Sequence, residues 1–280
     1  MFPSPFTYHR PAKVEDAVAL LARYGDDAAP YAGGTELLLA MKMGFAQYDH
    51  LVDLKRVPEL RVIARQGDAL SVGASARYAE IASNEIVSGA VPALAKLCGE
   101  IANPRVRSAG TIGGNLCFAE PRADPPTLLA ALGAELCLVS PRGERRVPAG
   151  GFVTGALETV RAQDELLLRI EIPLHARAIG YERIVFGHRT IAGAAATVTP
   201  GAAHVWVGCV ASCPSPLAKT EALLATDPDA SEDGALRKAV TQDIAALDIA
   251  DDEDASADYR RHLAKTVVMR AIASCREAVA

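Results

Sequence analysis

Two short segments with paired glycines constrain this chain more than any other feature: residues 31–36 (YAGGTE) and residues 110–115 (GTIGGN). Each sets two adjacent glycines beside a small hydroxyl residue. Glycine allows positive φ and lets a ligand approach the backbone where a Cβ would stand in the way. Successive N–H groups in such turns can converge on an anion, helped by a following helix. Two loops of this chemistry in one chain predict a diphosphate held from two sides.

The glycine spacing excludes the two commonest nucleotide-binding motifs. Neither segment supplies the G-x-G-x-x-G fingerprint of dinucleotide-binding Rossmann domains, and the chain has no G-x-x-x-x-G-K-[ST] phosphate loop. What remains is a diphosphate-bearing cofactor on another scaffold, for which FAD is the usual candidate.

A family resemblance rests on these same segments. Residues 32–38 (AGGTELL) and 107–116 (RSAGTIGGNL), the latter followed by Pro121, Asp124 and Pro125, resemble signatures of the FAD-binding medium subunits of the molybdenum hydroxylases. This is the xanthine dehydrogenase and carbon monoxide dehydrogenase family, and the resemblance covers essentially the whole chain. It implies an α+β protein: a two-lobed PCMH/VAO-type FAD-binding fold over residues 1–173, with lobes of about 1–56 and 57–173, then a C-terminal antiparallel sheet with helices over 174–280.

The resemblance also implies a set of cofactor-binding residues. The first segment would hold the FAD diphosphate and the second would line the flavin pocket. Asp124 matches a carboxylate that contacts ribose hydroxyls, Leu167 a position against the flavin ring or adenine, and Arg183 a basic position near the flavin. The full set is Ala32, Gly33, Gly34, Thr35, Glu36, Thr111, Ile112, Gly113, Gly114, Asn115, Asp124, Leu167 and Arg183.

Each of these residues also has a simpler interpretation from local chemistry. Thr35 suits an N-cap of the helix that follows it, and we expect the carboxylate of Glu36 to point away from the phosphates. Asn115 suits a turn, Asp124 a plain helix start before residue 127, and Leu167 a buried strand. The chain departs from the family pattern at residues 187–193 (GHRTIAG), so the resemblance makes no prediction for the loop over the flavin.

No catalytic or metal-binding set is expected. The six cysteines form no C-x-x-C pair and the six histidines are scattered without partner spacing. We therefore expect reduced thiols, no cluster on this chain and no metal.

The net charge and the hydropathy pattern indicate which partners and which location to expect. The formal net charge is −5, which gives no electrostatic reason to expect nucleic acid or anionic membranes as partners. The first ten residues lack the pattern of a secretory signal, and no apolar run reaches the length of a membrane span. We expect a cytoplasmic protein.

Periodicity predicts the elements. The opening reads as a small parallel β-α-β unit, residues 61–73 as a hairpin, and the acidic run 248–254 as a solvated loop. Helices are expected at 14–24, 37–43, 78–82, 91–97, 127–132, 217–225 and 258–279. Further strands are expected in a short stretch that ends at residue 31 and at 50–54, 135–139, 166–172, 181–186, 194–198 and 204–210.

The function that the resemblance implies is an oxidoreductase subunit that transfers electrons. FAD would be non-covalent, because no histidine lies in either glycine segment. Electrons would come from [2Fe-2S] clusters on an iron–sulfur small subunit and leave to an external acceptor, with molybdopterin on a large subunit, in a dimer of heterotrimers. Two alternatives stay open: a stand-alone FAD-dependent reductase, and an interaction module that has lost FAD. The sequence names neither the organic substrate nor the acceptor.

Overall fold

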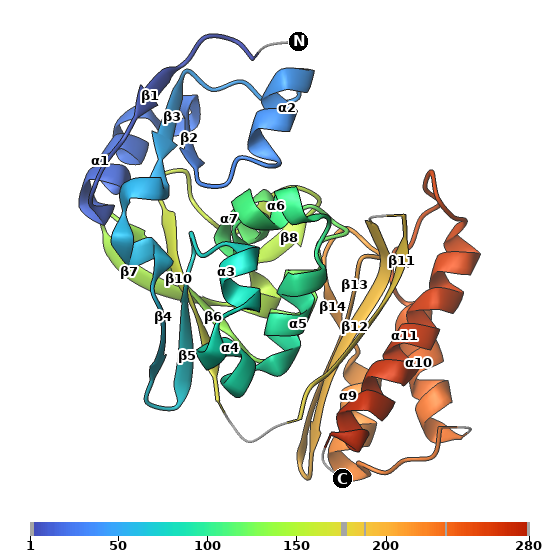
Figure 1. Ribbon diagram of the computed structural model, residues 1–280. Coiled ribbons are helices and arrows are strands. Elements are labelled where there is room, and N and C mark those ends of the chain that lie inside the picture. The colour runs from blue at the N-terminus through green and yellow to red at the C-terminus, as the bar shows by residue number, and fades with distance from the viewer. Residues whose placement is uncertain (1–2, 175–177, 188, 233, 279–280) are drawn as a thin grey trace.

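The computed structural model describes residues 3–174, 178–187, 189–232 and 234–278. Three sheets of three or more strands follow one another along the chain, and helices fill the space between the second and third of them (Figure 1). A long C-terminal helix covers the outer face of the third sheet. The α+β class is therefore confirmed. How the chain divides into independently folding domains stays a prediction.

The first lobe is a parallel three-stranded unit with the strand order β1-β3-β2. In α1 the apolar residues Val14, Ala17, Val18 and Leu21 share one buried face, and Gly25 ends the helix at a φ of 50°. The β-α-β prediction is confirmed, with β1 as an additional strand. The elements are β1 (Thr7–His9), α1 (Val14–Tyr24), β2 (Ala28–Tyr31), α2 (Leu37–Met43) and β3 (His50–Asp53).

The second lobe is built on a five-stranded antiparallel sheet with the order β4-β5-β10-β6-β7. Helices pack on one of its faces, and the largest buried core combines apolar side chains of these helices and of the sheet. Its strands are β4 (Ile63–Gln66), β5 (Ala69–Gly73), β6 (Glu135–Ser140), β7 (Gly143–Pro148) and β10 (Leu166–Pro173), with a small β8 (Val153–Gly155) and β9 (Glu158–Thr159) pair. Its helices are α3 (Tyr78–Ala82), α4 (Glu85–Ala90), α5 (Pro92–Glu100), α6 (Pro104–Ala109), α7 (Ile112–Phe118) and α8 (Asp124–Ala131).

The third lobe is an antiparallel sheet with the order β11-β12-β13-β14. One face lies so close to α8 that a Cβ on Gly208 would stand 1.9 Å from Thr127 Oγ1. The other face packs on α11, whose Ala271 carbonyl would be 1.9 Å from a Cβ on Gly180. The elements are β11 (Gly180–Phe186), β12 (Arg189–Thr199), β13 (Ala202–Gly208), β14 (Ser215–Pro216), α9 (Ala218–Thr226), α10 (Ala235–Ala245) and α11 (Ala257–Glu277).

Two local predictions near the glycine segments are wrong. The second segment is not a loop: it begins α7, with Thr111 as N-cap accepting from Gly114 N at 3.1 Å. Helix α8 begins at Asp124 rather than at residue 127, because prolines suit the first turn of a helix. The atypical stretch 187–193 is mostly strand β12, and His188 lies outside the described residues.

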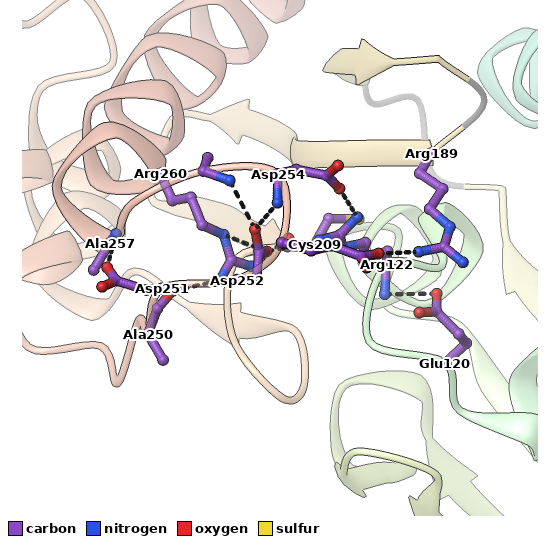
Figure 2. A network of polar contacts seen from close by, with 12 residues as sticks. Glu120, Arg122, Arg189, Cys209, Ala250, Asp251, Asp252, Asp254, Ala257 and Arg260 are labelled. Atoms are coloured by element: carbon purple, nitrogen blue, oxygen red, sulfur yellow. Dashed lines mark hydrogen bonds and ion pairs between the residues drawn. The ribbon is translucent and has the colours of Figure 1, made fainter.

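The acidic run 248–254 is a loop, but it is not simply solvated. Asp252 and Asp254 both pair with Arg122, which lies between α7 and α8 (Figure 2). Arg260 in α11 also pairs with Asp252, its Nε lying 3.2 Å from Oδ2. The loop therefore ties the third lobe to the second across 130 residues of sequence.

No helix among the described residues is long and apolar enough to cross a bilayer. The same residues hold no group of three or more histidine, cysteine or carboxylate side chains placed to bind a metal ion.

Candidate functional site

A cavity of about 250 Å³ lies between the first and second lobes. Its wall comes from the first glycine segment, the first turn of α7 and the start of β10. Of the residues predicted to bind a cofactor, those that line it are Ala32, Gly33, Gly34, Thr35, Glu36, Thr111, Gly113, Gly114, Asn115 and Leu167. The structure thus brings together segments that stand up to 135 residues apart in sequence, from position 32 to position 167.

The first glycine segment presents donors to this cavity. The N–H groups of Gly33, Gly34, Thr35 and Glu36 donate to no acceptor among the described residues. Gly34 has a φ of 70°, and a Cβ there would stand 2.3 Å from a ring carbon of Tyr31. Unsatisfied N–H groups gathered in a turn of this kind suit an anionic ligand.

The second segment uses its N–H groups differently. Those of Ile112 and Gly113 donate to carbonyls of the β5–α3 connection, at 3.1 Å to Ala76 O and 2.8 Å to Ala74 O. Those of Gly114 and Asn115 donate to the N-cap Thr111, through its Oγ1 and its carbonyl. The N–H groups of residues 112–115 are thus used within the chain, and contact of this segment with a diphosphate stays a prediction.

The glycines of the two segments serve different purposes. A Cβ on Gly33 would lie 2.2 Å from Ala109 O, and one on Gly113 would lie 2.5 Å from the Cβ of Ala74. These two glycines allow segments of the chain to touch. Gly114 meets only Thr111 Oγ1, at 2.8 Å, and is otherwise exposed at the cavity. Gly114 is thus the glycine of this set that leaves room for a ligand.

Two buried polar atoms on the cavity wall have no hydrogen-bond partner among the described residues: Tyr78 Oη and Asn115 Oδ1. Tyr78 is 3% exposed, and burial raises the pKa of its hydroxyl well above the usual value. An unsatisfied buried polar group costs about 1–3 kcal/mol. Both atoms fit a polar ligand that offers hydroxyl or amide groups, as the ribityl chain and ring edge of a flavin dinucleotide do.

Tyr78 was missed by the sequence analysis, which found only a helix start there. The signal could not be local, because Tyr78 joins the site through the fold: its N–H donates to Gly110 O at 3.1 Å. Glu36 is exposed along the cavity wall, and its negative charge adds to the burial that raises the pKa of Tyr78 and of Glu120. That its carboxylate points away from the phosphates stays a prediction.

Ile112, Asp124 and Arg183 do not line this cavity. Ile112 is fully buried in the core of the second lobe. Asp124 is 6% exposed, and its oxygens accept from Tyr181 Oη at 2.7 Å, Arg183 Nη1 at 2.9 Å and Thr190 Oγ1 at 3.0 Å.

Arg183 also reaches the end of α5. Its Nη2 donates to the carbonyl and to the carboxylate of Glu100, each at 3.2 Å, and the next residue, Ile101, lines the cavity. The geometry therefore indicates that Asp124 and Arg183 join the second and third lobes through hydrogen bonds, and it offers no support for direct cofactor contact.

Comparisons with known proteins identify the family. Residues 4–175 match the family model described as the FAD binding domain in molybdopterin dehydrogenase. The carbon monoxide dehydrogenase medium chain of Hydrogenophaga pseudoflava is 35% identical over 279 residues, covering 97% of each chain. The caffeine dehydrogenase subunit beta of a Pseudomonas species is 30% identical, covering 100% of this chain and 97% of the relative.

Solved structures give the same result. Carbon monoxide dehydrogenase from Hydrogenophaga pseudoflava, in a form lacking the Mo-pyranopterin moiety, superposes with a TM-score of 0.93 at 35% identity over 99% of both chains. Quinoline 2-oxidoreductase from Pseudomonas putida 86 superposes with a TM-score of 0.91 at 30% identity, again over 99% of both chains. The likeness includes the third lobe as well as the first two.

Proposed function

We propose that this chain, which belongs to the family of FAD-binding medium subunits of the molybdopterin dehydrogenases, holds one non-covalent FAD. It would relay electrons through this cofactor. Electrons would arrive from [2Fe-2S] clusters on a partner subunit and leave to an external acceptor. The observation that carries the proposal is one cavity that gathers unsatisfied N–H groups and two orphaned buried polar atoms. When bound, FAD supplies the redox chemistry that amino acid side chains lack.

The chain's own residues bind and orient the cofactor. The N–H groups of residues 33–36 would donate to the diphosphate, where unsatisfied backbone donors stabilise negative charge. Tyr78 Oη and Asn115 Oδ1 would satisfy polar groups of the flavin moiety. Leu167, 3% exposed, would supply an apolar wall for a ring.

The cavity offers little support for an independent reductase. Glu165 is the carboxylate buried at its wall, and the side-chain hydrogen bonds of Arg145 hold its pKa below the usual value. Burial raises the pKa of the Cys117 thiol, which disfavours a nucleophilic thiolate. Among the described lining residues these groups do not form a nucleophile–base pair. The second alternative, a module without FAD, leaves the unpartnered polar atoms of Tyr78 and Asn115 unexplained.

A multisubunit setting is part of the proposal. The relatives are named as medium chains and subunits of dehydrogenases. On this chain, helix α2 starts at the cavity and carries exposed apolar side chains: Leu39 is 52% exposed, Met43 55% and the adjoining Phe45 78%. Such a cluster suits an interface. We propose an iron–sulfur small subunit and a molybdopterin large subunit as partners, in a dimer of heterotrimers in the cytoplasm.

The test uses the purified chain, expressed alone and with its partner subunits. A visible flavin spectrum is expected for the chain alone, with the flavin released into the supernatant on acid precipitation. Colour that stays in the pellet would contradict non-covalent binding. Organic substrate should reduce the flavin only when both partner subunits are present, and reduction by the chain alone would favour the stand-alone reductase.

A further inference from the structure

A second cavity, of about 260 Å³, shares a wall with the cofactor cavity. Ala32, Gly33, Ser75 and Thr111 line both cavities. The lobes touch at this wall, since a Cβ on Gly33 would lie 2.2 Å from Ala109 O. Ala109 lines the second cavity and is not part of the wall of the first. The second cavity is thus a separate space at the junction of the same two lobes.

Three cationic side chains converge on this space: Lys55 from the first lobe, and Arg61 and Arg77 from the second. No carboxylate is among the described residues that line it. Lys55 Nζ lies 3.3 Å from Asp53 Oδ1, and Arg61 pairs with Glu80. These two cations are therefore partly neutralised from outside the cavity.

Arg77 differs from the other two. It is half-buried, and its guanidinium makes no hydrogen bond or ion pair with any described residue. The nearest carboxylate in sequence, Glu80, accepts from the Arg77 backbone N–H at 2.9 Å and from Arg61, and the charge of Arg77 helps to lower its pKa without a side-chain hydrogen bond or ion pair between them. A guanidinium presents several N–H donors in a fixed plane that matches phosphate and carboxylate oxygens. Arg77 therefore offers an unused anion-binding group to the cavity.

The wall also supplies a hydroxyl that has no hydrogen-bond partner among the described residues. Ser75 is 6% exposed, and its backbone N–H donates to Leu60 O at 2.7 Å, but its hydroxyl bonds to no described residue. By contrast, the hydroxyl of Ser108 on the same wall donates to Arg105 O at 2.9 Å. A hydroxyl donor beside three cations suits an oxyanion and disfavours a cation or an apolar ligand.

We propose that this second cavity is an anion site that binds a phosphate or diphosphate group of a small ligand. Arg77 makes the principal contact, Ser75 donates its hydroxyl, and Lys55 and Arg61 add positive charge.

The test is calorimetric titration of the flavin-loaded full-length chain with inorganic pyrophosphate. Bound flavin keeps the probe out of the first cavity. We expect one pyrophosphate per chain and a dissociation constant raised at least about tenfold in Arg77→Gln, because one charge-assisted contact is lost. The matched control is Arg56→Gln, which removes the same charge from an exposed neighbour that does not line the cavity. Its affinity should stay within about twofold of the parent.

Several results would overturn the proposal. These are the absence of pyrophosphate binding, an affinity unchanged by Arg77→Gln, an equal loss in Arg56→Gln, or release of flavin in proportion to the pyrophosphate bound. The last would place the probe in the first cavity. The inference does not depend on the cofactor, because a flavin-free preparation should still bind pyrophosphate through Arg77. A chain that bound pyrophosphate in this way but took up no FAD would contradict the proposed function and leave this inference intact.

Discussion

Replacing Arg122 by glutamine should loosen the third lobe from the second. The Arg122 side chain is 10% exposed, its Nη2 lies 2.7 Å from Asp252 Oδ2, and its Nη1 pairs with Asp254 (Figure 2). Glutamine keeps much of the length but removes the charge, so that two carboxylates, 22% and 21% exposed, face each other with less compensation.

The magnitude lies between two known limits. Removing one partner of a fully buried ion pair costs about 3–5 kcal/mol, and breaking an exposed pair costs about 0–1 kcal/mol. Here the carboxylates keep about a fifth of their exposure and Asp252 keeps Arg260 as a second partner, with Nε 3.2 Å from Oδ2. We expect a loss of about 2–3 kcal/mol in the free energy of unfolding, or a Tm lower by about 4–12 °C for a chain of this size.

The assay is urea unfolding followed by tryptophan fluorescence. The single tryptophan, Trp206 in β13, reports on this junction, because a Cβ on Gly150 of the second lobe would stand 2.4 Å from its ring. The control is Arg142→Gln, whose pair with Asp164 is on the surface with the arginine 65% exposed, and which should cost under about 1 kcal/mol. Equal losses in the two variants would refute the argument that partial burial strengthens the Arg122 contacts.

Three further predictions concern the cofactor cavity and the acidic loop. Tyr78→Phe should weaken FAD binding by about 2–10-fold, measured by flavin fluorescence, without lowering the Tm of the flavin-free chain, because the lost Oη has no partner there. Gly114→Val should abolish flavin uptake. The control Gly89→Val should retain it, because Gly89 lies on an exposed face of α4 and its Cβ would have nothing within 4 Å. Flavin at parent stoichiometry in Gly114→Val would contradict the assignment of Gly114 to the cavity wall. Burial alone would raise the pKa of Asp252, but hydrogen bonds from the backbone of Asp254 and Ala255 and from Arg122 outweigh it and hold that pKa below its usual value. The stabilisation is therefore full above about pH 4 and lost as the pH falls through the lowered pKa. Asp252→Asn should accordingly flatten the acid limb of a plot of urea midpoint against pH. An unchanged limb would show that Asp252 does not contribute to the acid sensitivity.

The sequence by itself determined the features that depend on neighbouring residues. Paired glycines beside a hydroxyl residue marked both walls of the cofactor cavity, and the four apolar residues of α1 predicted its buried face. The parallel opening unit and the hairpin over residues 61–73 follow from local periodicity and turn chemistry in the same way.

Tertiary structure alone decided which groups are satisfied within the chain and which are left for a ligand. Gly113 resembles Gly114 in sequence, yet Gly113 packs on Ala74 while Gly114 faces the cavity. Local pattern cannot tell them apart, because the distinction depends on a segment about 40 residues away, between positions 74 and 113. The same holds for Arg122, whose partners lie 130 and 132 residues along the chain. Hydrogen bonding and burial depend on which distant groups the fold brings into contact, and the spacing of residues along the chain does not predict those contacts.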